Sequence, residues 1–89
     1  MTYNVSYTDD VEKELNKLYK KNRGVYEKVK KKINRLRENP YNAEPLKADM
    51  KNRRSEHLPD SKVMVYEIDE ETKTIKILKY GDHGEVYGI

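Results

Sequence analysis

The sequence contains no cysteine, phenylalanine or tryptophan, and tyrosine supplies all eight of its large aromatic side chains. Without cysteine the chain forms no disulfide framework and offers no thiolate ligand to zinc. No apolar stretch reaches the roughly 20 residues that a membrane span needs, and residues 1–4 do not resemble the start of a signal peptide. We therefore expect a soluble, cytoplasmic protein.

Apolar residues are also scarce for a chain of 89 residues. Hydrophobic residues make up 35% of the sequence and charged residues make up 39%. A chain of this length has room for one modest core. These proportions predict a single domain over residues 1–89, with a thin core and a strongly ionic surface.

The net charge of +3 is unevenly distributed along the chain. Residues 20–37 form a basic stretch in which Glu27 is the only acid. A one-sided basic surface is typical of proteins that bind nucleic acid or an acidic protein partner. A solvated helix face is the alternative. The basic residues of the stretch are Lys20, Lys21, Arg23, Lys28, Lys30, Lys31, Lys32, Arg35 and Arg37.

The first half of the chain predicts one strand and two helices. Residues 2–7 alternate between apolar and polar side chains, which is typical of a half-buried strand. Asp9 and Glu12 resemble a capping box at the start of a helix that residues 22–24 end. A second helix begins at once and stops at residues 39–40. Because the break is so short, we expect an antiparallel helical hairpin.

The second half predicts a sheet. Residues 40–52 have the prolines and polar residues of a loop, and three strands follow at residues 53–58, 62–69 and 74–80, before a tail. Residues 62–69 are apolar on both faces, so we expect them at the centre. The connections are short, which predicts an antiparallel meander. The expected fold is α+β: an N-terminal strand, an antiparallel two-helix hairpin on one face, and a three-stranded antiparallel meander that completes a four-stranded sheet.

His57 and His83 are the only two histidines. His57 ends one predicted strand and His83 follows another, so a meander can bring them to the same region. Two imidazoles near neutral pH can act as general base and general acid. Metal-independent RNA cleavage needs this pair: one group takes the proton of the ribose 2′-OH and the other protonates the leaving 5′-oxygen. A zinc site is not favoured, because neither Asp60 nor Asp82 completes a compact ligand spacing.

Other residues in these segments could assist such a site. Tyr87 follows His83 by four residues and could stack on an unpaired base or take part in proton transfer. Its alternative role is to pin the tail to the sheet. Fixed cations would bind the phosphates, and the candidates are Lys47, Arg53, Arg54, Lys62 and Lys79.

These segments together resemble the RelE/ParE toxin superfamily. The resemblance rests on residues 44–47, 53–58, 63–69, 75–78 and 81–87, and on their order and spacing along nearly the whole chain. It implies the RelE-like fold and the toxin component of a type II toxin–antitoxin system.

Within this superfamily the chain is most similar to the YafQ-type branch of mRNA interferases. In that branch the site is formed by residues that match His57, Asp60, His83 and Tyr87 here. The resemblance implies an endoribonuclease that needs no metal or cofactor. It would cleave mRNA in the ribosomal A site and so inhibit translation. It also implies a cognate antitoxin, which should be acidic where it meets the basic helix.

The sequence departs from this branch at three positions. Lys62 stands where the superfamily usually has arginine, so any phosphate contact there is not bidentate. Ala48 and Asp49 replace a glycine and a histidine, which leaves the division of acid and base roles open.

Two other functions remain open on the same fold. One is a ParE-like, non-enzymatic poison of DNA gyrase, which would need no histidine. The other is a plain RNA-binding domain. In the ribonuclease reading, the basic second helix contacts ribosomal RNA or the partner through Lys28, Lys31, Lys32 and Arg35.

Overall fold

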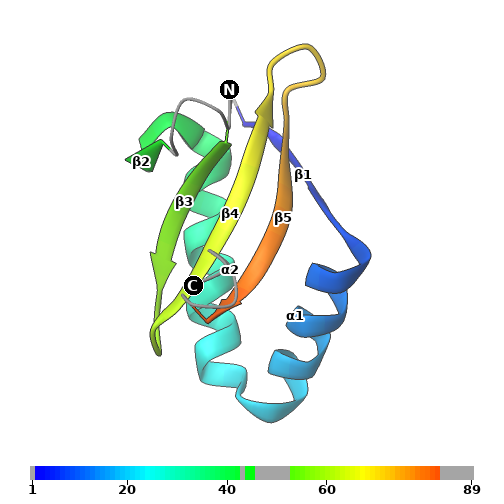
Figure 1. Cartoon of the computed structure of the whole chain (residues 1–89), viewed down its shortest axis with the longest axis vertical. Helices are drawn as coiled ribbons and strands as arrows, with labels where there is room; N and C mark the ends of the chain where they lie inside the picture. Colours follow the sequence, from blue (N-terminus) through cyan, green and yellow to red (C-terminus); the bar gives the residue numbers. More distant parts are fainter. Residues whose placement is uncertain (1, 43, 46–52, 83–89) are drawn as a thin grey trace.

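The computed structural model describes residues 2–42, 44–45 and 53–82. These residues form two helices on one side of a mixed sheet, with α2 passing behind β4 in Figure 1. The strand order is β1-β5-β4-β3-β2, in which β1 runs parallel to β5 and the other pairs are antiparallel. The elements are β1 (Asn4–Tyr7), α1 (Asp9–Lys21), α2 (Arg23–Glu38), the 3₁₀ turn η1 (Pro40–Asn42), β2 (Glu44–Pro45), β3 (Arg53–Leu58), β4 (Lys62–Asp69) and β5 (Thr74–Asp82).

This architecture confirms the expected α+β fold, its helical hairpin and its antiparallel meander. The prediction that residues 40–52 form only a loop was wrong at two places. η1 follows α2 directly, and the two-residue strand β2 pairs with β3 at the edge of the sheet. Strand β5 also extends two residues beyond the predicted end at residue 80.

The start of α1 differs from the predicted capping box. Thr8, not Asp9, is the N-cap, and its side chain accepts a hydrogen bond from the backbone N–H of Val11 (3.3 Å). Asp9 instead lies in the first turn, where its negative charge is favourable beside the helix N-terminus. A threonine one position earlier supplies the same capping chemistry.

A single residue, Asn22, joins the two helices. Its backbone N–H donates to the carbonyl of Leu18 (2.8 Å), and its side-chain oxygen accepts from the N–H of Val25 (3.1 Å). Asn22 therefore ends α1 and begins α2. Because one residue serves both caps, the chain reverses at once and both helices pack on the same face of the sheet.

The core lies between that helical pair and the sheet. From β4, the central strand, Met64, Tyr66 and Ile68 face the helices, and each is at most 4% exposed. They are joined by Ile75 and Ile77 of β5. The helices contribute Val11, Leu15, Val29, Ile33 and Leu36. The apolar run at residues 62–69 thus lies at the centre, as its sequence predicted.

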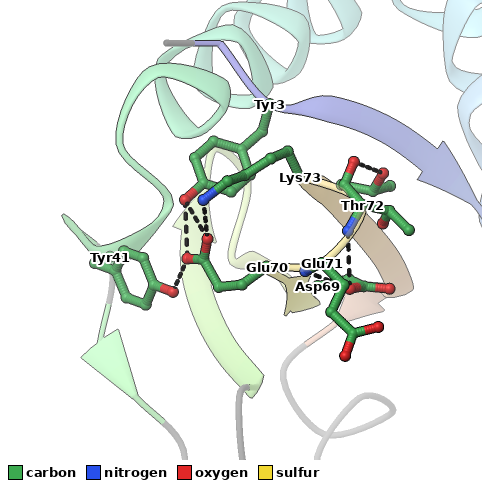
Figure 2. Close-up of polar contacts among 8 residues, drawn as sticks. Tyr3, Tyr41, Asp69, Glu70, Glu71, Thr72 and Lys73 are labelled. Carbon is green, nitrogen blue, oxygen red and sulfur yellow. Dashed lines mark hydrogen bonds and ion pairs between the residues drawn. The ribbon is translucent and has the colours of Figure 1, made fainter.

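A polar cluster at the far end of the sheet ties three segments together (Figure 2). The Glu70 carboxylate, in the β4–β5 turn, accepts hydrogen bonds from the hydroxyls of Tyr3 (2.9 Å) and Tyr41, and from the Lys73 ammonium (2.6 Å). These bonds connect the start of β1, η1 and the β4–β5 turn. The Lys73 ammonium above all, and then the two hydroxyls, lower the pKa of Glu70 to about 2.

We predict that Glu70→Gln destabilises the protein at neutral pH. Because the folded-state pKa of Glu70 is depressed, its contribution is present above its usual value of 4.5 and is lost as the pH falls towards about 2. The difference between variant and parent in urea midpoint should therefore shrink over this range.

Glu71→Gln is the matched control, because the Glu71 side chain makes no hydrogen bond or ion pair within the described ranges. A Glu70→Gln effect that is absent at pH 7, or equally large at pH 7 and near pH 2, would contradict this account.

Candidate active site on the open face of the sheet

The two faces of the sheet carry different side chains. Successive residues of a strand point to opposite faces. Since Met64 and Tyr66 face the helices, Val63 and Val65 lie on the opposite side, which we call the open face. The β3–β4 register places His57 beside Val63 on this face.

Across β3, β4 and β5 the open face is organised in three rows. Each row joins one residue from each strand, because the register aligns them directly. Neighbouring rows are two residues apart in β3 and β4, or about 6.6 Å along a strand, whereas in β5 the last two rows are three residues apart. The rows are His57–Val63–Gly81, Ser55–Val65–Lys79 and Arg53–Glu67–Lys76.

A β-bulge in β5 brings Lys76 and Lys79 to the same face. The register with β4 shifts between Val65 and Tyr66, which pair with Lys79 and Ile77, so Leu78 is the extra residue. In a regular strand two residues three apart point to opposite faces. Bulges often re-aim side chains beside active sites. Here the bulge adds one more cation to the open face.

Thr8 supports this bulge from the neighbouring strand. Its backbone N–H donates to the carbonyl of Ile77 (3.2 Å), and its hydroxyl donates to the carbonyl of Leu78 (3.4 Å). The same hydroxyl oxygen caps α1. One threonine thus joins the helix start to the bulge.

The centre of the open face is buried and its margin is charged. Ser55, Val63 and Val65 are at most 6% exposed. Around them lie exposed His57 and Lys79 and half-buried Arg53. This arrangement can bind an anionic chain beside an imidazole that can exchange protons.

Among the described residues of the open face, the cations Arg53, Lys76 and Lys79 outnumber the acids Glu67 and Asp69. The Nε atom of Arg53 is 3.4 Å from the Glu67 carboxylate, and the Lys76 ammonium is 3.9 Å from that of Asp69. Both pairs are partly exposed to solvent, and such pairs are weak. Lys79 has no ion pair within residues 2–42, 44–45 and 53–82.

The β3–β4 turn follows Leu58, the residue after His57. Asp60 and Ser61 in this turn both have positive φ, at 62° and 60°, and the N–H of Lys62 donates to the carbonyl of Pro59 (3.4 Å). Positive φ at both central residues is what a type I′ hairpin turn requires, and this turn fixes the position of Asp60 near the end of β3. Asp60 lines a groove of about 450 Å³ on the helix side of the sheet, together with Lys62 and Tyr80.

The structure separates the sequence-predicted phosphate ligands. Arg53 and Lys79 share the open face with His57. Arg54 and Lys62 belong to the opposite face. Arg54 donates to the carbonyl of Tyr41 (3.2 Å), and its guanidinium lies 4.9 Å from the centre of the Tyr41 ring. Lys62 forms an ion pair with Asp82 (2.7 Å). The remaining candidates, Lys47, His83 and Tyr87, lie outside the described residues.

The predicted basic face of α2 is exposed except where it meets the sheet. Lys28, Lys31 and Arg35 are exposed to solvent. Lys32 instead forms an ion pair with Glu56 of β3 (3.0 Å). This face and the open face lie on different sides of the molecule, so they can contact different ligands.

Lys76 is the member of the open face that the sequence prediction omitted. Strict alternation from Lys79 assigns Lys76 to the helix side. The signal was nevertheless present in the apolar residues. Ile75, Ile77 and Tyr80 all pack on the core, and a spacing of two and then three requires one inserted residue.

The order of elements matches a known toxin family. A family model described as the ParE toxin of the type II toxin–antitoxin system parDE matches residues 5–87. The chain belongs to the ParE toxin family, within the RelE/ParE superfamily. It is thus a toxin of a type II toxin–antitoxin system by family. No helix of the described ranges is long and apolar enough to cross a membrane.

Relatives of this ParE-family toxin are similar over almost their full length. A putative toxin RelE4 of Methanocaldococcus jannaschii is 25% identical, over 96% of this chain and 90% of its own. A solved double mutant of E. coli toxin RelE in the free state is 27% identical with a TM-score of 0.81, over 99% of this chain and 93% of its own. The toxin of the E. coli RelBE toxin–antitoxin complex is 26% identical with a TM-score of 0.78, over 90% of this chain and 95% of its own.

We predict that Thr8→Ala destabilises the toxin by about 1 to 2 kcal/mol, because it removes both the helix cap and the hydroxyl bond to the bulge. Thr8→Ser keeps the hydroxyl and is the matched variant, with an expected change below about 0.5 kcal/mol. Urea denaturation measures both values. Equal stabilities for the alanine and serine variants would show that the hydroxyl has no such role.

Proposed function

We propose that this toxin is a metal-independent endoribonuclease that cleaves mRNA on the open face of the sheet. His57 and His83 are the acid–base pair. One removes the proton of the ribose 2′-OH, whose oxygen attacks the adjacent phosphorus. The other protonates the departing 5′-oxygen, which breaks the phosphodiester bond and leaves a 2′,3′-cyclic phosphate.

The position of His57 is the observation that carries this proposal. Its imidazole is exposed on a net positive face with a buried floor, in the same row as Gly81. Two strand spacings separate the Cα atoms of His57 and Gly81, which is about 10 Å. His83 lies outside the described residues, two positions after Gly81 in the sequence, and its part in the acid–base pair is proposed from the sequence alone.

The other residues have supporting roles in this proposal. Asp60, in the β3–β4 turn near His57, is a positioning residue, and Tyr87 stacks on a base next to the cut or contributes its hydroxyl. Arg53 and Lys79 bind phosphates beside His57. Lys47 is assigned to the same task, whereas Arg54 and Lys62 would contact RNA that extends beyond the edge of the open face.

The relatives support an antitoxin partner. The E. coli toxin RelE to which this chain is similar forms a complex with the antitoxin RelB. We propose an acidic cognate antitoxin for this toxin, in the cytoplasm. The exposed cations Lys28, Lys31 and Arg35, with Lys32 beside them, would meet ribosomal RNA or that antitoxin. Such a contact should weaken steeply with salt.

We predict that His57→Ala and His83→Ala each reduce the cleavage rate of a translated reporter mRNA by about 10²- to 10⁴-fold, the usual contribution of a general acid or base. Cleavage in a cell-free translation extract, followed by primer extension, measures this loss. Asn16→Ala, at an exposed position of α1, is the control and should cleave like the parent. Full activity in both histidine variants would refute the assignment.

A ParE-like poison of DNA gyrase is the second candidate, because the matching family model describes a ParE toxin. This activity requires no histidine. Supercoiling by purified gyrase therefore separates the two functions. Inhibition of gyrase by the parent and by both histidine variants, without mRNA cleavage, would establish the second candidate instead.

A further inference from the structure

We propose that Lys76 is a substrate-positioning residue, which binds an RNA phosphate beyond the one that Lys79 binds. This inference rests on the proposed function and extends it. The strand bulge at Leu78 is the device that creates the site, because it turns Lys76 and Lys79 to one face.

The rows define a direction for the bound RNA. His57 lies in the row next to the β3–β4 turn, Lys79 belongs to the middle row, and Lys76 belongs to the row beyond it. Each step is about 6.6 Å along the strands. An RNA strand cut at His57 can therefore follow Lys79 and then Lys76 towards the β4–β5 turn. Arg53, at the other end of the Lys76 row, flanks the same path.

The Lys76 ammonium is available for such a contact. Its side chain is 47% exposed, and its distance of 3.9 Å from the Asp69 carboxylate makes a weak pair. The other oxygen of that carboxylate accepts the backbone N–H groups of Glu71 (3.0 Å) and Thr72 (3.3 Å). These bonds, the Thr72 N–H first, lower the pKa of Asp69. The Asp69 carboxylate thus keeps these two backbone hydrogen bonds when the Lys76 ammonium moves to a phosphate.

The bulge has a second effect besides the orientation of Lys76, because it lets Ile75, Ile77 and Tyr80 pack together on the core. Stability therefore accounts for the bulge but not for the lysine. Any polar residue at position 76 would satisfy the fold, so the charge itself can be tested separately from folding.

The experiment uses ribosomes programmed with a defined mRNA as the substrate of the full-length toxin. Lys76→Gln is expected to lower kcat/KM by about 3- to 10-fold, an effect of the size of one exposed charge contact. The plot of log(kcat/KM) against log salt should become shallower by about 0.7, because one phosphate contact is lost. Lys76→Arg keeps the charge and should stay within about twofold of the parent.

Lys13→Gln is the charge-matched control, because Lys13 is exposed on α1 and has no ion pair within the described part of the chain. Unfolding midpoints of all variants should match, since position 76 is at the surface. If the parent cleaves and Lys76→Gln behaves like Lys13→Gln in rate and salt slope, this inference is overturned and the proposed function stands. If the parent itself does not cleave, the proposed function fails.

Discussion

The fold depends on covering the apolar face of β4 and β5 with the two helices. Met64, Tyr66, Ile68, Ile75 and Ile77 supply that face, and they are almost fully buried beneath α1 and α2. A chain with so few apolar residues has no second core to offer. The strand geometry must therefore adapt to this one contact, and the register shift at Leu78 is the adaptation.

This constraint separates stability from function across the sheet. The core lies on the helix side of the sheet. Thr8 caps the start of α1, and Glu70 accepts the hydrogen bonds of the polar cluster at the far end of the sheet. The open face makes no contribution to the helical core, so its margin is free to carry His57, Arg53 and two lysines. The same bulge that completes the core thus collects the cations that the proposed ribonuclease activity uses.

The sequence alone predicted what depends on patterns within one segment. The apolar run at residues 62–69 identified the central strand, and the short break predicted at residues 22–24 identified the hairpin, although only Asn22 lies outside both helices. The sequence could not show what depends on pairing between segments. Alternation along β3 puts Arg53, and not Arg54, on the face of His57, but that this face is the one away from the helices follows from the β3–β4 register. Likewise, the position of Lys76 follows from one inserted residue, and strand β2 exists only through its pairing with β3. The roles of all the assigned site residues remain predictions, and Lys47, His83 and Tyr87 lie outside the described residues.

The central claim is that RNA lies on the open face of the sheet. The most direct measurement is the change in backbone amide chemical shifts when an mRNA fragment is added. A 2′-deoxy residue at the cleavage position keeps the fragment intact, because the attacking hydroxyl is absent. The account predicts that shifts concentrate at His57, Val63, Val65 and Lys79 and spare the helix–sheet core. Shifts confined to α1 and α2, with none in the three rows of the open face, would contradict it.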